Sequence, residues 1–156
     1  MAEEYSLISV LMVEDDPGDQ KLIKASLRKQ KMHFNLSICS SGEEALEYLN
    51  SCQIDDLEKP LPDLILLDLN MPGMGGKAFL AKIKEIDVLK TIPVVILTTS
   101  DSEKDILETY QLNAAGYINK PVNLTEFSDV VSRLTDYWFV LCKTAARNKA
   151  YAGQCN

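Results

Sequence analysis

The chain has 156 residues, a formal net charge of −7 and 46% hydrophobic residues, which is the size and composition of one globular domain. The excess of acid disfavours a surface that binds nucleic acid, and the sequence has no apolar run as long as a membrane span. The first residues show no signal-peptide pattern, and the four cysteines form neither a CxxC pair nor a cluster with the one histidine. We therefore expect a cytoplasmic protein without zinc or redox chemistry that binds neither nucleic acid nor a membrane.

Apolar runs alternate along the chain with stretches of helical spacing. Strands are predicted over Leu7–Val13, Phe34–Cys39, Asp63–Leu67, Val94–Leu97 and Gly116–Ile118. Helices are predicted from Asp16 to about Lys31, from Ser41 onwards, over Lys77–Ile86, from Asp101 or Ser102 to about Leu112, and from Asn123 to about Leu141. The alternation of apolar and polar residues over 34–39 indicates a half-exposed edge strand, and Ser41 with Glu44 has the pattern of a capping box.

This alternation of strands and helices indicates an α/β fold, with a parallel sheet covered by helices on both faces. Neither repeats nor a linker divide the chain, so we expect one domain over 1–156, with its core at about 7–141 and a polar tail at 143–156. The connection Ser51–Pro62 is longer than usual between a helix and a strand, which indicates an insertion or a contact surface.

The end of the last predicted helix is unusually apolar. Its apolar side is predicted to comprise Phe127, Val130, Val131, Leu134, Tyr137, Trp138 and Leu141. The neighbours Trp138 and Phe139 are not expected to face the core together. Either one of them lies flat on the surface, or the segment is an interface between two copies of the chain.

Polar residues follow four of the predicted strands. Asp68 ends the strand over 63–67, and a loop rich in Pro and Gly comes after it. Taken alone, Asp68 is better explained as a turn or helix-capping residue. Three other strands end in Glu14 with Asp15, in Thr98 and in Lys120. Because the carboxyl ends of parallel strands meet at one edge of a sheet, where ligands bind in open α/β folds, we expect these side chains to converge.

Converging carboxylates repel one another, so a proton or a cation must compensate their charge. An all-oxygen site with open positions suits Mg²⁺, which binds through a few carboxylates and shares a phosphate. Lys120 adds a cation and Thr98 a hydroxyl, the groups that stabilise a phosphoryl group. Asp68 at the centre can then act as the nucleophile and form an acyl phosphate.

Four motifs together resemble bacterial response-regulator receiver domains. They are MVEDD at Met12–Asp16, LLDLNMPGMGG at Leu66–Gly76, ILTTS at Ile96–Ser100 and GYINKP at Gly116–Pro121. The resemblance spans roughly 7–141 and implies a five-stranded sheet in the order 2-1-3-4-5, the flavodoxin-like or CheY-like doubly wound fold. No helix-turn-helix segment remains after it, so a stand-alone receiver without an output domain is expected.

The resemblance also implies a role for each residue of the site. Asp68 is expected to accept a phosphoryl group from a phosphohistidine of a sensor histidine kinase. Asp15 and Asp68 are expected to bind Mg²⁺, with Glu14 acting through water and Asn70 through its backbone carbonyl. Lys120 is expected to bridge Asp68 and the phosphate, Thr98 to bind a phosphate oxygen, and Tyr117 to turn inward behind Thr98 as the second half of the switch. A cis bond between Lys120 and Pro121 is expected to aim the lysine.

Two positions depart from the family pattern. Gly75-Gly76 stands where Asp-Gly is common, which affects the rigidity of the loop, and Thr99 stands where a small residue is frequent, which affects access to the phosphate. The long 51–62 connection, the LTTS ending and the aromatic segment DYW resemble the small receivers that pair with bacterial phytochrome kinases. The signal is expected to leave through the fourth helix, fifth strand and fifth helix, with a homodimer as one form of output.

Three other functions fit less well. A haloacid-dehalogenase-type phosphatase needs a second acid where this chain has Asn70, and in a flavodoxin-like FMN protein Glu14 and Asp15 would repel the phosphate. An interaction domain with a dead site would lack at least one of the residues Asp15, Asp68, Thr98 and Lys120, and all are present. The chain is thus expected to be a phosphoacceptor that assists its own phosphorylation and hydrolysis, and not a metabolic enzyme.

Overall fold

The computed structural model describes residues 8–52 and 58–142 of the chain. Within them, a five-stranded parallel sheet has the order β2-β1-β3-β4-β5, which confirms the predicted fold class. The strands are β1 (Ile8–Val13), β2 (Phe34–Cys39), β3 (Leu64–Leu67), β4 (Val94–Thr98) and β5 (Gly116–Asn119). Every strand begins and ends within one residue of its predicted bounds.

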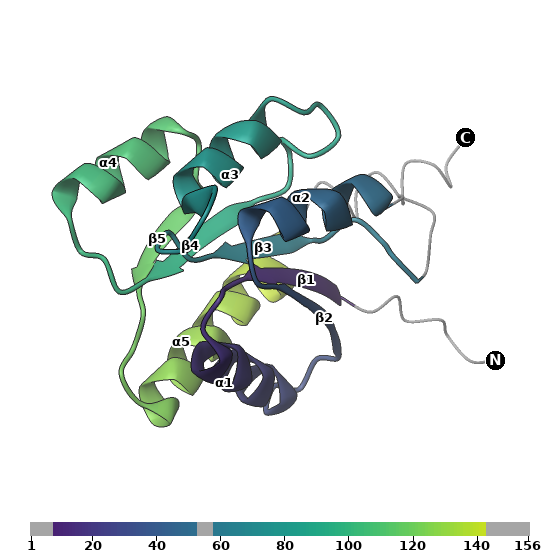
Figure 1. Ribbon diagram of the computed structural model, residues 1–156. Helices are drawn as coiled ribbons and strands as arrows, with labels where there is room; N and C mark the ends of the chain where they lie inside the picture. Colours follow the sequence, from purple (N-terminus) through teal and green to yellow (C-terminus); the bar gives the residue numbers. More distant parts are fainter. Residues whose placement is uncertain (1–7, 53–57, 143–156) are drawn as a thin grey trace.

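Helices cover both faces of the sheet. Their bounds are α1 (Pro17–Arg28), α2 (Gly42–Ser51), α3 (Gly75–Lys84), α4 (Glu103–Gln111) and α5 (Leu124–Thr135), followed by the π-helix η1 (Asp136–Leu141). Figure 1 shows α1 and α5 together below the sheet and α2, α3 and α4 above it. The helix predicted from Lys77 begins two residues earlier, at Gly75, because the loop after β3 turns directly into it.

The core consists of two clusters, one on each face of the sheet. Successive residues of a strand point to opposite faces, so the apolar runs of the central strands contribute to both. In β3, Ile65 packs in the cluster that contains Phe79 of α3, whereas Leu66 packs in the cluster that contains Phe127 of α5. All four residues of β3 are buried, which holds the residue that follows them at a defined place on the sheet edge.

Side-chain caps place the starts of the helices beside the ends of the strands. The capping residues are Asp16 for α1, Ser41 for α2, Ser102 for α4 and Asn123 for α5. In the predicted capping box, Ser41 Oγ accepts from the N–H of Glu44 at 3.1 Å, but the Glu44 carboxylate accepts from the N–H of Ser40. The β2 strand is partly exposed along most of its length, as expected of an edge strand.

The prediction for the end of the last helix was right in its extent, to Leu141, and in placing Trp138 on the core side, but wrong in the facing of Tyr137 and Leu141. The α-helix stops at Thr135 and continues as a π-helix, whose N–H(i+5) to C=O(i) bonds put an extra residue in each turn and shift the facing of the side chains. Tyr137 and Leu141, expected on the apolar side, are 54% and 76% exposed. Trp138 and Phe139 instead both pack against the core on the α1 and α5 side, where the Phe139 ring lies 5.7 Å from that of Phe34.

Two further observations concern the rest of the chain. None of the helices in the described residues is long and apolar enough to cross a membrane. The connection predicted over Ser51–Pro62 begins within the end of α2, and its residues 53–57, like the predicted tail at 143–156, lie outside the described residues.

Candidate functional site

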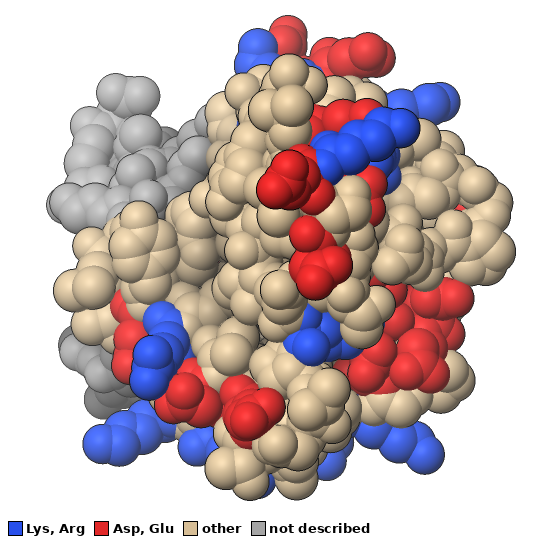
Figure 2. Space-filling model, turned by 90° about the vertical axis from the view of Figure 1, so that its left-hand side faces the viewer, with Lys and Arg blue, Asp and Glu red and all other residues tan. Residues whose placement is uncertain are grey.

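Three carboxylates meet where β1 and β3 end. The two strands pair in parallel with Val13 opposite Leu67, so Glu14 and Asp68 leave the sheet side by side, and the N–H of Asp68 donates to the carbonyl of Val13 at 3.0 Å. One oxygen each of Glu14, Asp15 and Asp68 lies within 4.8 Å of the others. Figure 2 looks onto this end of the molecule and shows acidic side chains gathered there with basic ones beside them. The predicted convergence of the acids is therefore observed.

Lys120, from the end of β5, reaches into this acidic group. Its ammonium lies 2.9 Å from a Glu14 oxygen and 3.4 Å from an oxygen of Asp68, and its side chain is only 5% exposed. The backbone places it, because the N–H of Lys120 donates to the carbonyl of Thr98 at 2.7 Å. The bond to Pro121 is trans, as are all peptide bonds between described residues, so the expected cis bond is absent. A trans bond is the ordinary state of an X–Pro peptide. The lysine is held in the site by its ion pairs with the carboxylates.

A further acid, Asp19, belongs to the site and was missed in the sequence. Asp19 lies in the first turn of α1, and its carboxylate is 2.8 Å from the Lys120 ammonium, the shortest of the three contacts. Acids are common in the first turn of any helix because they favour the positive end of its dipole. The sequence signal that could have found it is its position one turn after Asp15 and Asp16, on a helix that starts at the site.

Burial and close ionic contacts shift the pKa values of Glu14 and Lys120. Burial raises the pKa of the Glu14 carboxyl to about 7, an effect that hydrogen bonds from Lys120 and the N–H of Asp16 oppose. Burial alone would lower the pKa of Lys120, but hydrogen bonds to Asp19 and Glu14 outweigh it and hold this pKa above its usual range. The lysine is therefore charged at neutral pH, yet it faces more carboxylates than one cation can neutralise.

The donor set fits a small divalent cation. Mg²⁺ holds oxygen ligands at about 2.1 Å, so two ligands on opposite sides of the ion are about 4.2 Å apart. The separation of up to 4.8 Å among the three carboxylate oxygens is close to that span, and small side-chain rotations or a bridging water close the difference. Glu14, Asp15 and Asp68 could thus hold the ion, and all their donor atoms are hard oxygens of the kind it prefers.

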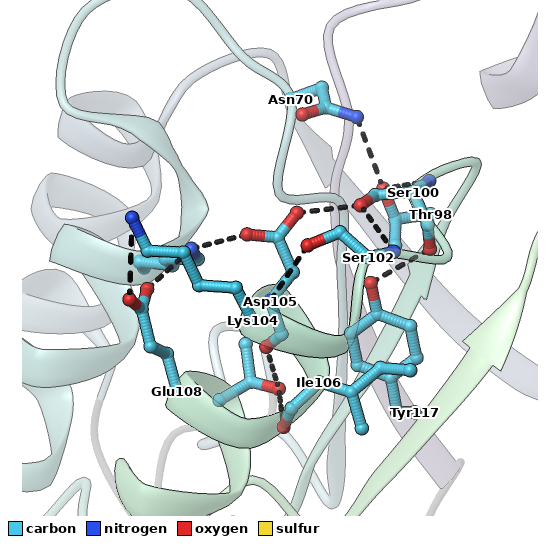
Figure 3. Close-up of polar contacts among 11 residues, drawn as sticks. Asn70, Thr98, Ser100, Ser102, Lys104, Asp105, Ile106, Glu108 and Tyr117 are labelled. Atoms are coloured by element: carbon cyan, nitrogen blue, oxygen red, sulfur yellow. Dashed lines mark hydrogen bonds and ion pairs between the residues drawn. The ribbon is translucent and has the colours of Figure 1, made fainter.

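Thr98 and Tyr117, the predicted switch residues, meet at a third residue, Ser100 (Figure 3). The fully buried Thr98 hydroxyl accepts from the N–H of Ser100 and from the side-chain amide of Asn70, both at 3.4 Å. The Tyr117 hydroxyl donates to the carbonyl of Ser100 at 2.8 Å. Tyr117 is half-buried and packs against the core on the α3 side, so the two residues act on the same turn of the β4–α4 loop.

From Ser100 the polar contacts continue into α4. The Ser100 hydroxyl donates to Asp105 in the first turn of α4 at 2.6 Å (Figure 3). Asp105 also pairs with Lys77 of α3. Lys77 also contacts Glu108, one turn further along α4. The hydrogen bond from Lys77, and then that from Ser100, lowers the pKa of Asp105, while the hydrogen bond to Asp105 raises the pKa of Lys77. These contacts join the loop beside Thr98 to two helices.

The loop after Asp68 is shaped by glycines. Gly73 and Gly75 have φ angles of 78° and 74°, in the left-handed region that favours glycine. A Cβ on Gly76 would lie 2.4 Å from the carbonyl oxygen of Asp68. The N–H of Asn70 donates to Asp68 Oδ1 at 3.3 Å, which places this residue, predicted to offer its carbonyl to the metal, directly beside the acidic group.

A parallel α/β sheet with three clustered carboxylates and a buried lysine at the carboxyl ends of its strands has the architecture of a receiver domain. The family model described as response regulator receiver domain matches residues 10–132, and the chain belongs to this family. Response regulator Rcp1 of Synechocystis sp. is 37% identical over 129 residues, which are 83% of this chain and 87% of Rcp1. The probable methanogenesis regulatory protein FilR2 of Methanothrix harundinacea is 31% identical over 83% of this chain and 82% of its own.

Solved structures agree with this assignment. The phosphorylated cyanobacterial phytochrome response regulator RcpA superposes with a TM-score of 0.82 at 34% identity, over 89% of this chain and 99% of RcpA. The Mn²⁺-bound form of Rcp1 superposes with a TM-score of 0.78 at 34% identity, over 87% of this chain and 97% of Rcp1. The predicted family and fold class are both confirmed.

Proposed function

We propose that Asp68 accepts a phosphoryl group from the phosphohistidine of a sensor histidine kinase, with Mg²⁺ held by Glu14, Asp15, Asp68 and the Asn70 carbonyl. One observation carries the proposal: Asp68 lies at the end of a buried strand, among clustered carboxylates and 3.4 Å from a buried ammonium. In the transfer, a carboxylate oxygen of Asp68 forms a bond to phosphorus. The P–N bond to the kinase imidazole breaks, and its electron pair goes to that nitrogen.

The chain's own residues stabilise this transfer. A bound Mg²⁺ would supply positive charge to the phosphoryl oxygens. Lys120 neutralises a second oxygen, and the Thr98 hydroxyl can donate to a third once its bond partners rearrange. Tyr117 then follows through Ser100, which both residues contact. The chain in this proposal is a phosphoacceptor that assists its own phosphorylation and hydrolysis, and not a metabolic enzyme.

The proposed kinase is a bacterial phytochrome, and the chain acts with it in the cytoplasm. Support comes from two similar proteins. RcpA is a cyanobacterial phytochrome response regulator, and AtBRR, which is 34% identical to this chain, is a bacteriophytochrome response regulator. Output is proposed to occur by homodimerisation through the face formed by α4, β5 and α5, without binding nucleic acid. On this face α4 exposes the apolar side chains of Leu107 and Tyr110, and η1, which continues α5, exposes Tyr137, Val140 and Leu141.

The test of the phosphoacceptor is incubation with acetyl phosphate and Mg²⁺, read by intact mass. The wild type is expected to gain one phosphoryl group, and Asp68→Asn none. Absence of the added mass on the wild type, or equal labelling of the variant, would contradict the proposal. Transfer from a phosphorylated bacteriophytochrome kinase tests the partner, and size-exclusion chromatography with and without acetyl phosphate tests the dimer.

A further inference from the structure

The ammonium of Lys120 is held by three carboxylates at unequal distances. Asp19 is at 2.8 Å, Glu14 at 2.9 Å and Asp68 at 3.4 Å. A lysine ammonium has three N–H donors, so this arrangement occupies all of them. The contact with the phosphoacceptor is the longest of the three, and the contact with a residue of α1 is the shortest.

Two of these contacts determine the direction of the third. The N–H bonds of an ammonium diverge at fixed angles, so pairing with Asp19 and Glu14 leaves the remaining N–H facing Asp68. The long contact to Asp68 is the one that can be exchanged for an oxygen of an incoming phosphoryl group without moving the nitrogen. A lysine side chain is flexible, and an ammonium already held in the required orientation does not have to reorient when charge develops during the transfer.

Asp19 differs from Glu14 in its relation to the cation site. Glu14 and Asp68 belong to the group of three carboxylates that could hold a divalent ion, and Asp19 does not. A cation in that group shares the charge of Glu14 and Asp68 and weakens their attraction for the ammonium. The Asp19 carboxylate, 22% exposed and outside the group, keeps its full charge for the lysine.

We propose that Asp19 is a positioning residue that holds the Lys120 ammonium so that one N–H faces Asp68 and the phosphoryl group it accepts. This inference rests on the proposed phosphorylation of Asp68. A merely structural role for Asp19 is the alternative, because an acid in the first turn also stabilises α1 through the helix dipole. The two roles differ in what a change of side-chain length does, since the helix dipole requires the charge but not its exact place.

Three variants separate these roles. Asp19→Asn keeps the shape and an acceptor oxygen but removes the charge, and Asp19→Glu keeps the charge in the first turn but displaces the carboxylate. Asp16→Asn is the matched control, because Asp16 is an exposed acid that caps the same helix. Its side chain accepts from the N–H of Gly18, and only its backbone contacts Glu14 and Gln20, so the substitution leaves those bonds and the Lys120 contacts in place. Urea unfolding first establishes that each variant is folded.

The rate of phosphorylation by acetyl phosphate is measured at saturating Mg²⁺. We expect Asp19→Asn and Asp19→Glu each to slow it about tenfold, below the 10²–10³-fold loss of a complete electrostatic contact, because Glu14 still holds the lysine. Asp16→Asn is expected to stay within about twofold of the wild type, because it leaves the Lys120 contacts intact. An Asp19→Glu protein with the wild-type rate, or an Asp19→Asn protein no slower than Asp16→Asn, overturns the inference.

A second readout does not depend on phosphorylation. In ¹⁵N-labelled protein, the Nζ protons of buried, fully paired Lys120 are expected to exchange slowly enough to be observed, and Lys120→Met identifies their signal. The signal is expected to be lost in Asp19→Asn and retained in Asp16→Asn. A Lys120 signal unchanged in Asp19→Asn overturns the inference, whereas a wild type that takes up no phosphate overturns the proposed function.

Discussion

Replacing Gly76 by alanine tests the close approach between the start of α3 and the backbone of Asp68. A Cβ at this position would lie 2.4 Å from the carbonyl oxygen of Asp68 and 2.7 Å from Cα of Leu69. Both obstacles are backbone atoms, so no side chain can rotate away to admit the methyl group. The N–H of Gly76 also donates to the carbonyl of Leu69 at 3.2 Å, which ties the two segments together.

The size of the effect follows from this geometry. Overpacking a buried site costs about 1–3 kcal/mol, and two backbone contacts place Gly76→Ala at the upper end, about 3 kcal/mol. With a urea dependence of about 2 kcal/mol per M, the midpoint of unfolding should fall by about 1.5 M. Urea titration followed by far-UV circular dichroism measures this directly.

The neighbouring glycine provides the control. Gly75 has a φ of +74° but nothing within 4 Å of its Cβ position, so substitution there costs only backbone strain. Gly75→Ala should lose about 1–2 kcal/mol, and Gly75→Asn less, because asparagine tolerates the left-handed region. A Gly76→Ala midpoint equal to that of Gly75→Ala would refute the reasoning, because it would mean that the backbone moves aside without cost.

Three more variants test other parts of the site. Lys77→Met should accelerate amide hydrogen exchange across 103–111 but not in the other helices. In the wild type, the hydrogen bonds from Lys77 and Ser100 hold the pKa of Asp105 below its usual range, so the same change should appear only in acid below that range, where the carboxylate loses its charge. Thr99→Ala should shorten the lifetime of the phosphorylated protein, since it opens the approach to the phosphate, and equal hydrolysis rates would contradict this. Asp15→Asn should weaken Mg²⁺ binding, measured by calorimetry, at least tenfold, as removal of a carboxylate ligand does.

The sheet and the convergence of the acids could be predicted because both depend on local patterns. An unbroken apolar run such as that of β3 forms a strand buried on both faces, and the βα alternation makes the sheet parallel. Given those two features, the same edge of the sheet must carry Glu14, Asp68, Thr98 and Lys120, however far apart they lie in the sequence. The positions follow from topology, while the roles assigned to these residues stay predictions.

The contacts that could not be predicted are those for which the local pattern has another explanation. Asp19 looks like any acid in the first turn of a helix, and only the tertiary structure shows that it faces Lys120. Glu43, in the first turn of α2, accepts from the N–H of Met74 at 2.7 Å, a contact between residues far apart in the chain. The π-helix after Thr135 could not be predicted, because the apolar pattern of these residues does not distinguish an α-helix from a helix with an extra residue in each turn.

The attachment of α4 explains how a change at Thr98 can reach the surface. Of the nine residues of α4, all of them described, only Thr109 is fully buried, whereas Leu107 and Tyr110 are 59% and 48% exposed. By contrast, α3 buries Phe79, Leu80 and Ile83. Because α4 buries little apolar surface, polar contacts contribute more to holding α4 in place than to holding α3 in place.

Those polar contacts begin at Thr98, the last residue of β4. The N–H of Ser100 is bonded to the Thr98 hydroxyl, and the hydroxyl of Ser100 to Asp105, which Lys77 holds against α3. If Asp68 is phosphorylated as proposed, a Thr98 hydroxyl drawn toward a phosphoryl oxygen would leave that N–H to find another acceptor and would move the turn that carries Ser100. Since the same turn accepts the Tyr117 hydroxyl, α4 and β5 would then respond to one local event, without a rearrangement of the two apolar cores.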